Sequence, residues 1–543
     1  MKQKQVLCAG IAACMLAASL AGCGGNNNQN TTTENYDFSN PVTTGEYPME
    51  TDVQLTWWVP LNGNVAAHSQ SMNDIPLTQY LKEDTGVSIQ FQHPPTGQET
   101  EKFNLMVASR DLTDIIETNW TNYQGGPSKA IVDKIIIPLN DAVEYVSPNY
   151  KQFLDEHPEH AKYVKTDDGD IYVYPFVRNL DKARTFMGFM VRKDYLEQAG
   201  MEAPETIEEW DQMLRAFKAN GIEIPLNIRV DNDNAKLVSP FTSAYGFILD
   251  FYVDGGTVKF GPYEQAFRDY VTQLNTWYND GLLDKNFTEY KDNKQLDANV
   301  INGKVGATYG YGSSDFGKWY TGITANDPNA DFVPVKYPAQ TKGETPMYGQ
   351  KERIITGQGA AITTTCKDKE IAARLLDYGY SEKGRMLYTY GREGVSYEIV
   401  DGVPRFMDSV LDTNLNGGLS QMQALGKYTR TAYNGPFYAI RDEKDTSMEE
   451  KSPKAVQDAP GIWAQTNADT YMLPLLSLTT EENTELNDIM QDINVFREEK
   501  LFKFISGDEP LSNLDQYFEQ LKSLGIERAL EIQQAAYERF MNR

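Results

Sequence analysis

Cysteine is scarce in this sequence. The 543 residues contain four, namely Cys8, Cys14, Cys23 and Cys366. The first two lie in the apolar run that opens the chain, so the disulfide framework that holds small secreted domains together is excluded. Cys366 stands alone in the later sequence, where a small buried hydrophobic side chain is expected.

Basic residues are also few. The chain has 50 Lys and Arg against 77 Asp and Glu, which gives a formal net charge of −27. Binding to nucleic acid needs a basic surface that neutralises phosphates, so no nucleic-acid partner is expected. No apolar stretch reaches the ~20 residues of a membrane-spanning helix. The 40% of hydrophobic residues favours a large globular body.

Familiar catalytic motifs are missing. The sequence has no His-Glu-x-x-His, Gly-x-Ser-x-Gly or Gly-x-x-x-x-Gly-Lys-Ser/Thr pattern. Gly310-Tyr311-Gly312 begins like a dinucleotide loop, but Asp315 stands at the third glycine position. His157 and His160 have the spacing of a metal pair, although a solvated helix face is the favoured interpretation. Paired carboxylates of a glycoside hydrolase stay open, because the many acidic residues permit many pairs.

The N-terminus has the pattern of a secretory signal. Lys2 and Lys4 precede an apolar run over 6–20, and Leu20-Ala21-Gly22-Cys23 follows. This tetrapeptide resembles the bacterial lipobox, which implies removal of the signal peptide 1–22 and a palmitate-bearing lipid on Cys23. A signal without lipid and a buried N-terminal helix are the less favoured alternatives.

The segment that follows is typical of a tether. Residues 24–50 are rich in Gly, Asn and Thr and contain too few apolar side chains to form a core. We therefore expect residues 23–50 to serve as lipid anchor and disordered tether. The folded body would then be held on the extracellular face of the cell membrane through the Cys23 lipid alone.

Strands and helices alternate from residue 53 onward. Residues 53–59 and 87–91 show the alternation of strands, and 114–118 forms a short apolar run. Helices are expected at 75–85, ended by Gly86, and at 103–108. This order predicts a parallel α/β lobe.

Helices are better marked later in the chain. Thr206-Ile207-Glu208-Glu209 fits a capping box, and Asn220-Gly221 is a stop signal. Trp210 lies on the apolar face of this helix and Trp277 on that of the next, so both are expected in the core. Further helices are expected over 267–278 and 486–496, after a Ser512 cap and over 526–541, and strands over 331–335 and 359–363.

Several stretches then carry family-like motifs in order. They are 56–61, 103–116, 168–175, 191–196 with 204–210, 390–397, and 505–508 with 532–540. Together they resemble extracellular solute-binding proteins of family 1, the sugar receptors of ABC importers, and most of all the large lipoproteins of the LipO and alginate-binding type. The resemblance covers about residues 50–543.

The resemblance implies a two-lobed α/β fold of the type II periplasmic-binding-protein kind. Each lobe would be a mixed sheet flanked by helices, with a hinge between the lobes. The implied N-lobe is 51–177 plus 331–383, and the implied C-lobe is 178–330 plus 384–543. No disulfide or cofactor is implied.

The resemblance also implies a function. The chain would be the substrate-binding subunit of an ABC importer, a monomer and not an enzyme, that captures an oligosaccharide and delivers it to the permease subunits. A surface polysaccharide hydrolase and a receptor for another solute, such as a peptide, stay open. The sequence does not specify the sugar.

One family feature is absent. Alginate-type relatives carry an EF-hand-like calcium loop directly after the Ala-Phe-Lys of the capped helix. Here Ala216-Phe217-Lys218 continues into 219–225, which lacks the oxygen ligands of a hard cation, so no metal site is expected. Asp231 and Asp233 do not restore one, because Ala235 and Thr242 fail the later ligand positions.

A sugar site combines aromatic plates with fixed hydrogen-bonding groups. The candidate ligand-binding residues are Trp57, Trp58, Trp120, Tyr172, Trp319, Glu393, Tyr397 and Trp463. Trp57 and Trp58 are neighbours on a strand and face opposite sides, so at most one can line the cleft. Trp120 follows a strand end, where open α/β folds bind ligands. Packing in the core is the alternative for each aromatic candidate.

Overall fold

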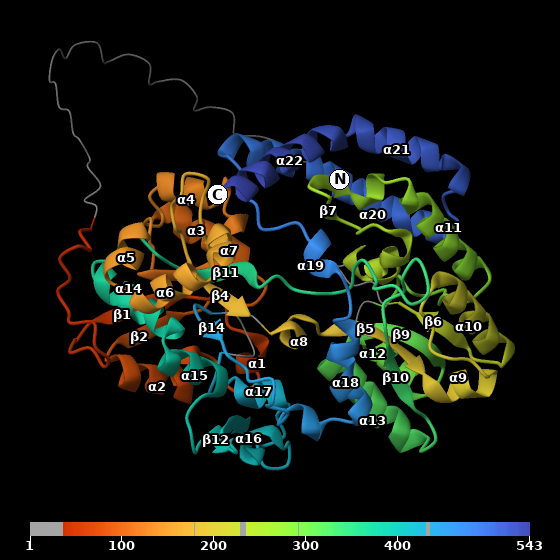
Figure 1. Cartoon of the computed structure of the whole chain (residues 1–543), viewed down its shortest axis with the longest axis horizontal. Coiled ribbons are helices and arrows are strands. Elements are labelled where there is room, and N and C mark those ends of the chain that lie inside the picture. Colours follow the sequence, from red (N-terminus) through yellow and green to blue (C-terminus); the bar gives the residue numbers. More distant parts are fainter. Residues whose placement is uncertain (1–35, 179, 229–234, 291–292, 431–434) are drawn as a thin grey trace, which may run out of the picture. The chain divides into compact units, whose positions relative to one another are not determined.

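The computed structural model describes residues 36–178, 180–228, 235–290, 293–430 and 435–543. The predicted signal peptide, Cys23 and residues 24–35 of the predicted tether lie outside the described residues, as do Asp231 and Asp233. The prediction of a disordered tether is wrong for residues 38–50, which belong to the compact folded unit. Phe38 and Met49 are buried there, and the Glu370 carboxylate accepts from the backbone N–H groups of Val42 at 2.6 Å and Thr43 at 3.0 Å. Residues 38–543 form one compact unit, in which two separate main sheets are surrounded by helices (Figure 1). The predicted two-lobed α/β fold is confirmed.

The first sheet is six-stranded, with the order β14-β4-β11-β3-β1-β2. Its strands are β1 (Gln54–Trp58), β2 (Ser88–Gln92), β3 (Ile115–Asn119), β4 (Tyr174–Arg178), β11 (Ile355–Ile362) and β14 (Tyr438–Ala439). β1 pairs in parallel with β2 and with β3, as the strand–helix alternation predicts. β11 runs antiparallel to β3 and β4, which makes the sheet mixed.

The second sheet is four-stranded, with the order β10-β5-β9-β6. Its strands are β5 (Met187–Arg192), β6 (Ile224–Asn227), β9 (Val305–Tyr311) and β10 (Phe332–Val335). Two antiparallel hairpins stand apart from the main sheets: β7 (Phe251–Asp254) with β8 (Thr257–Phe260), and β12 (Tyr397–Val400) with β13 (Val403–Phe406).

Helices flank both sheets. Those in the sequence before β5 are α1 (Gly63–Ala66), α2 (Pro76–Thr85), α3 (Glu99–Ser109), α4 (Gly126–Val132), α5 (Asn140–Tyr145), α6 (Pro148–Glu156), α7 (Pro158–Ala161) and α8 (Asp181–Arg184). Between β5 and β10 lie α9 (Lys193–Ala199), α10 (Ile207–Ala219), α11 (Ala266–Asn279), α12 (Asn293–Ile301) and α13 (Gly317–Asn326).

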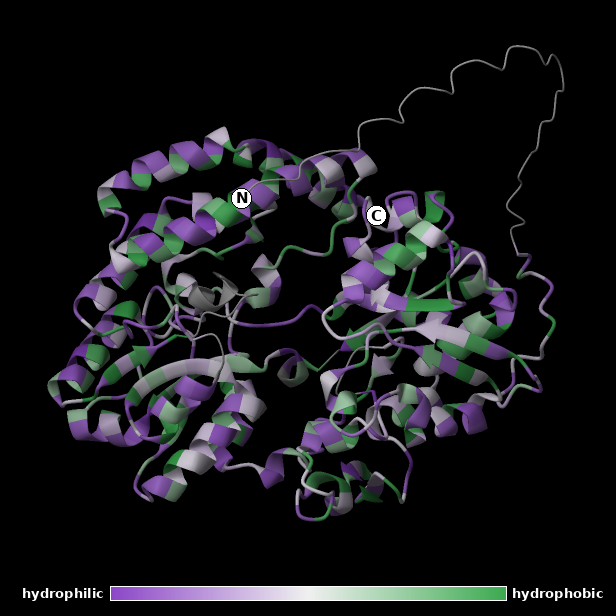
Figure 2. Cartoon of the chain, turned by 180° about the vertical axis from the view of Figure 1, so that it is seen from behind, coloured by the Kyte–Doolittle hydropathy of each residue, from purple (hydrophilic) through white to green (hydrophobic). Residues whose placement is uncertain are grey.

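The remaining helices follow β11. They are α14 (Lys369–Asp377), α15 (Glu382–Tyr390), α16 (Asp408–Leu411), α17 (Gln421–Leu425), α18 (Lys454–Trp463), α19 (Ala468–Tyr471), α20 (Thr480–Ser506), α21 (Leu514–Ser523) and α22 (Ile526–Asn542). Hydrophobic and hydrophilic residues alternate along the outer helices, as expected where one helix face packs inward (Figure 2).

Local signals explain where several helices begin and end. Thr206 caps α10 by accepting a hydrogen bond from the backbone N–H of Glu209 at 3.3 Å. Gly86 ends α2 in the left-handed conformation, with φ of 80°. The expected Ser512 cap is wrong, because Leu511–Asn513 wind into a 3₁₀ turn and Asn513 occupies the N-cap position of α21.

Two strands correct the predicted allocation of segments to lobes. β10 lies within 331–383, predicted for the N-lobe, yet it pairs with β5 in the second sheet. β14 lies within 384–543, predicted for the C-lobe, yet it pairs with β4 in the first sheet. The cause is hydrophobic burial: Phe332 and Val335 of β10 are buried in the core of the second sheet. The rest of the allocation stays a prediction.

The chain therefore passes between the sheets at places other than those expected. It crosses between β4 and β5, between β10 and β11, and between β14 and α18, which packs on β10 and β5. We call these connections the crossing segments. Among the described residues, no helix has both the length and the apolar character needed to cross a membrane.

Candidate functional site

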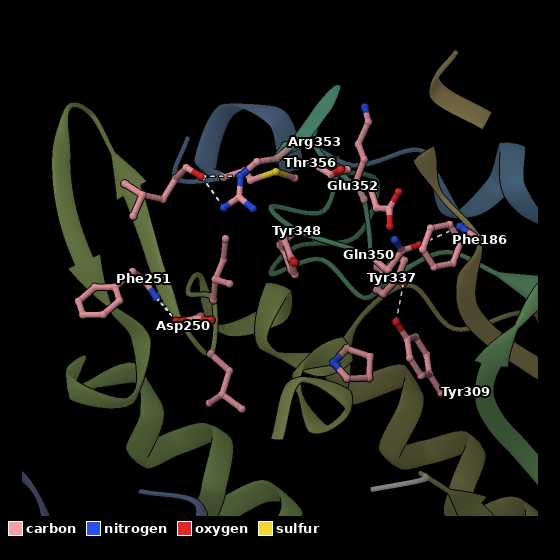
Figure 3. Close-up of a pocket in the computed structure, with 16 residues that line it drawn as sticks. Phe186, Asp250, Phe251, Tyr309, Tyr337, Tyr348, Gln350, Glu352, Arg353 and Thr356 are labelled. Carbon is pink, nitrogen blue, oxygen red and sulfur yellow. Dashed lines mark hydrogen bonds between the residues drawn. The ribbon is translucent and has the colours of Figure 1, made fainter. Parts of the chain in front are cut away.

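A cavity of about 470 Å³ lies beside the second sheet (Figure 3). It is lined by Phe186, Pro240, Ile248, Leu249, Asp250, Phe251, Tyr309, Tyr337, Tyr348, Gln350, Lys351, Glu352, Arg353, Thr356, Met472 and Leu473. Its volume falls within the range of about 300–1,000 Å³ that is typical of small-molecule sites. We call it the central cavity.

Two crossing segments supply much of the lining. Phe186 immediately precedes β5, and residues 348–353 lead into β11, where Thr356 is the second residue. Tyr309 lies on β9 and Tyr337 follows β10. The cavity is therefore built where the chain passes from one sheet to the other, so a ligand bound there would contact the hinge connections.

Gln350 and Tyr337 fix the geometry of one wall. The Gln350 side-chain oxygen accepts hydrogen bonds from the backbone N–H groups of Phe186 at 2.8 Å and Met187 at 3.1 Å. The Tyr337 hydroxyl accepts from the Gln350 backbone N–H at 3.0 Å and donates to the Met187 carbonyl at 2.9 Å. The Tyr309 hydroxyl is 3.0 Å from that of Tyr337. These bonds hold the tyrosines in place before any ligand binds.

Charges of both signs border the cavity. The Arg353 guanidinium donates to the Leu473 carbonyl from Nε at 2.9 Å and from Nη2 at 2.6 Å. Burial lowers the pKa of Arg353. The Glu352 carboxylate accepts from Arg178 at 2.7 Å, and Asp250 accepts from the backbone N–H of Phe251 at 2.8 Å.

The tyrosines act as neutral hydrogen-bonding groups. Burial raises the pKa of Tyr309 and that of Tyr337 well above the ordinary value, so both phenols are protonated near neutral pH. Burial likewise raises the pKa of Tyr348, which in Figure 3 stands between Asp250 and Gln350. The lining thus combines aromatic faces with neutral donors and acceptors.

Thr356 brings a hydroxyl that has no partner within the described part of the chain. Its Oγ1 is buried, although the residue lines the central cavity. Leaving a buried hydroxyl without a hydrogen bond costs about 1–3 kcal/mol. A polar group entering the cavity could supply the missing bond, which favours a ligand rich in hydroxyls.

None of the residues predicted from sequence lines this cavity. Trp319 is buried, and its Nε1 donates to Asp297 at 2.7 Å. Trp463 is buried as well, and its Nε1 donates to the Phe189 carbonyl at 3.1 Å. Both belong to the hydrophobic core around the second sheet.

Glycines on β5 and β9 make room for these two tryptophans. A Cβ atom on Gly188 would lie 2.3 Å from the Trp463 ring, and one on Gly310 would lie 3.0 Å from the Trp319 ring. The Gly310-Tyr311-Gly312 pattern therefore serves close packing of a strand against aromatic rings.

The tryptophans of the first sheet are packed in a similar way. Trp57 contacts Phe91 with ring centroids 5.5 Å apart, whereas Trp58 contacts Phe103 at 5.9 Å. These different partners fit the expectation that the two side chains face opposite sides of β1. Phe103 also packs against the buried Trp120, with centroids 5.9 Å apart.

The other predicted residues lie apart from one another. Tyr172 is buried and donates to the Tyr163 carbonyl at 3.1 Å. Tyr397 packs against Tyr390 in a small separate core, and Glu393 is exposed beside it. The structure thus gives the aromatic candidates packing partners, and their role in ligand binding stays a prediction.

Sequence reasoning missed the residues that do line the cavity. Phe186, Asp250, Tyr309, Tyr337 and Gln350 come from segments far apart in the chain, and no local motif joins them. The available signal was weak: residues 348–353, Tyr-Gly-Gln-Lys-Glu-Arg, combine an aromatic with polar groups a few residues before the strand predicted over 359–363.

Comparisons with known proteins agree with this fold. The fructooligosaccharide ABC transporter substrate-binding protein FusA of Streptococcus pneumoniae serotype 4 is 23% identical over 96% of this chain and 96% of its own length. Lipoprotein LipO of Bacillus subtilis is 22% identical over 83% of this chain and 86% of its own. The chain spans nearly the whole length of both relatives.

Solved structures give the same result. The alginate-binding protein AlgQ2 without calcium ion has a TM-score of 0.69 and 24% identity, covering 90% of this chain and 99% of that chain. FusA in complex with kestose also has a TM-score of 0.69, with 22% identity, 90% of this chain and 100% of that chain. The family model described as bacterial extracellular solute-binding protein matches residues 63–386, more than half of the sequence. The predicted resemblance is thereby confirmed, and this chain belongs to the bacterial extracellular solute-binding proteins.

Proposed function

We propose that this chain is the lipid-anchored substrate-binding subunit of an ABC importer and captures an oligosaccharide in the central cavity. Family membership carries the proposal, because proteins of this family bind solutes outside the cell. The name of FusA assigns fructooligosaccharide to a relative that matches along almost the whole chain. The Cys23 lipid would hold the protein at the membrane, beside the permease that receives the sugar.

The chemistry of the central cavity supports a sugar ligand. Phe186, Tyr309 and Tyr348 offer aromatic faces to the apolar C–H surfaces of a pyranose or furanose ring. Asp250 and the unpartnered Thr356 hydroxyl offer hydrogen bonds to its hydroxyls.

The crossing segments supply a mechanism for capture. Phe186, Tyr348 and residues 350–353 line the cavity and lie on segments that connect the sheets, so a bound sugar would change the energy of hinge bending. Ligand binding shifts the balance toward a closed form only by its difference in affinity for the two forms. The permease would then recognise the closed, loaded receptor and receive an unaltered sugar.

The test uses the full chain with Cys23→Ala, which stays free of lipid. Calorimetric titration with kestose, with alginate oligomers and with a peptide mixture measures binding, and chromatography of the recovered ligand measures its integrity. We expect saturable binding of one sugar class, a higher melting temperature and intact ligand. Shortened oligosaccharides would instead support a hydrolase, and binding of peptides alone would support a different solute.

A further inference from the structure

A second group of side chains lies outside the central cavity and joins two imidazoles to a carboxylate. Within the described ranges, His157, Glu159 and His160 have ligand atoms that all lie within 4.8 Å of one another. Glu159 Oε1 is 3.6 Å from Nδ1 of His157 and 3.6 Å from Nε2 of His160. Metal–ligand bonds of about 2.0–2.1 Å in a tetrahedral site place neighbouring ligand atoms about 3.3 Å apart. Small side-chain movements therefore suffice to close this set around an ion.

The backbone presents the two imidazoles on the same side. His157 ends α6, where its N–H donates to the Phe153 carbonyl at 3.0 Å, and its own carbonyl accepts from the His160 N–H at 2.9 Å. Pro158 at the first position of α7 restricts the turn between them. Two imidazoles held by one helical turn can reach the same ion.

Packing holds both rings in that arrangement. The His157 and His160 rings stack with centroids 5.3 Å apart and an interplanar angle of 19°. The Phe153 ring contacts them at 5.1 and 6.0 Å. Side chains fixed in this way lose little conformational entropy when they bind an ion.

The carboxylate is free to complete the set. The Glu159 side chain is 62% exposed, and within the described residues its ion-pair contacts are with these two histidines. Cations nearby have partners of their own: Arg184 pairs with Asp181 at 3.0 Å and with Asp469, and Lys162 donates a hydrogen bond to the Met541 carbonyl at 2.9 Å.

We propose that His157 Nδ1, the Glu159 carboxylate and His160 Nε2 bind one divalent transition-metal ion of the zinc class. Imidazole nitrogen favours zinc, whereas calcium and magnesium prefer all-oxygen sets. Three protein ligands leave a fourth position for water or a bound molecule. Glu159 and His160 border a cavity of about 460 Å³ that shares Arg353, Met472 and Leu473 with the central cavity. The ion would therefore sit next to the proposed sugar site without depending on it.

The test is a titration of the full Cys23→Ala chain with zinc chloride, after removal of any histidine tag and dialysis against a chelator. We expect one saturable zinc ion per chain and no saturable binding of calcium in a parallel titration. The His157→Asn/His160→Asn double variant should lose at least ~10-fold in zinc affinity, whereas His68→Asn, a histidine far along the sequence, should bind as the parent does.

Three readouts keep the proposal falsifiable. Glu159→Gln changes an exposed side chain and should weaken zinc without altering the melting temperature of the metal-free protein. Cobalt should give the intense visible absorption of a tetrahedral site in the parent and lose it in the double variant. Absence of saturable zinc binding, or equal affinity in parent and double variant, would overturn the site whatever the sugar titration shows.

Discussion

Lys351 Nζ lies 2.6 Å from the carboxylate of Asp469 and thereby ties the crossing segment before β11 to α19. Asp469 also accepts from Arg184 Nη1 at 3.2 Å, on the crossing segment before β5. The side chains of Lys351 and Arg184 are only 5% and 4% exposed, whereas that of Asp469 is 52% exposed. Asp181 lies 3.0 Å from Arg184 and 3.3 Å from Lys351, so Asp469 and Asp181 together balance two nearly buried cations at the hinge connections.

Asp469→Asn should lower the free energy of unfolding by roughly 1–3 kcal/mol, because removal of the carboxylate leaves two buried cations with reduced compensation. This loss of stability is smaller than that for fully buried ion pairs, because water screens the half-exposed Asp469 carboxylate. Urea unfolding measures it. Glu485→Gln is the matched control, since Glu485 pairs with Arg528 at 2.9 Å on the surface and should matter much less. Equal losses in both variants would contradict the role of Asp469.

Asp377 predicts a pH dependence of stability. Its carboxylate accepts from the Tyr150 N–H at 2.7 Å and from Asn149 Nδ2 at 2.6 Å, and burial raises its pKa to about 7. The folded pKa exceeds the unfolded value of about 3.9, so the stabilising contribution is complete below pH ~4 and is lost as the pH rises to ~7.

Asp377→Asn should therefore remove a fall in unfolding free energy of up to about 1.4 kcal/mol per pH unit between these limits. The difference between parent and variant, measured by urea unfolding from pH 4.5 to 8, isolates this group from all others. Asp155→Asn, on the exposed face of α6, controls for the loss of one carboxylate. The unfolding free energy of the parent minus that of the variant should fall as the pH rises. A value of this difference that stays constant or increases with pH would refute the prediction.

Gly188→Ala should destabilise the second sheet by about 1–3 kcal/mol, because the new methyl group would meet the Trp463 ring at 2.3 Å. Gly461→Ala is the opposite case: it lies inside α18 with no neighbouring atom within 4 Å of the added Cβ. That variant should gain up to ~1 kcal/mol through helix propensity. Thermal melts should show a lower melting temperature for Gly188→Ala and a higher one for Gly461→Ala. An unchanged melting temperature in Gly188→Ala would mean that the Trp463 ring is not tightly packed against β5.

Thr356→Val tests the central cavity. If a sugar hydroxyl bonds the free Thr356 hydroxyl, its loss should weaken ligand binding about 3- to 10-fold with little change in stability. Thr272→Val is the control, because Thr272 is exposed on α11 and its hydroxyl bonds the Arg268 carbonyl at 2.7 Å. Unchanged affinity in Thr356→Val would place the sugar elsewhere.

Cys23→Ala tests the anchor. In cells fed labelled palmitate, the parent chain and the Cys366→Ala variant should both become labelled, because Cys366 is buried and is not the predicted lipid site. The Cys23→Ala variant should not become labelled. The unlabelled variant should also leave the membrane fraction. Label that still enters Cys23→Ala would remove the lipid assignment.

Local patterns predicted local structure well. The alternation of 53–59 became β1, and the Thr206 signal placed the start of α10 correctly. The lobe boundaries were harder, because which sheet β10 joins depends on burial of Phe332 against residues far away in sequence. The presence of tryptophans in the sequence did not reveal the site. Trp319 and Trp463 are core residues whose indole N–H groups form hydrogen bonds within the protein.

The late arrival of β14 has a consequence for assembly of the protein. The outer edge of β4 in the first sheet is covered only when Tyr438–Ala439 pair with it. The strands β1 to β4 therefore form a complete lobe only after most of the polypeptide has been synthesised. A truncated product that ends before this strand would expose an unpaired sheet edge to other chains. Shortened versions of this protein should therefore aggregate instead of yielding an isolated half.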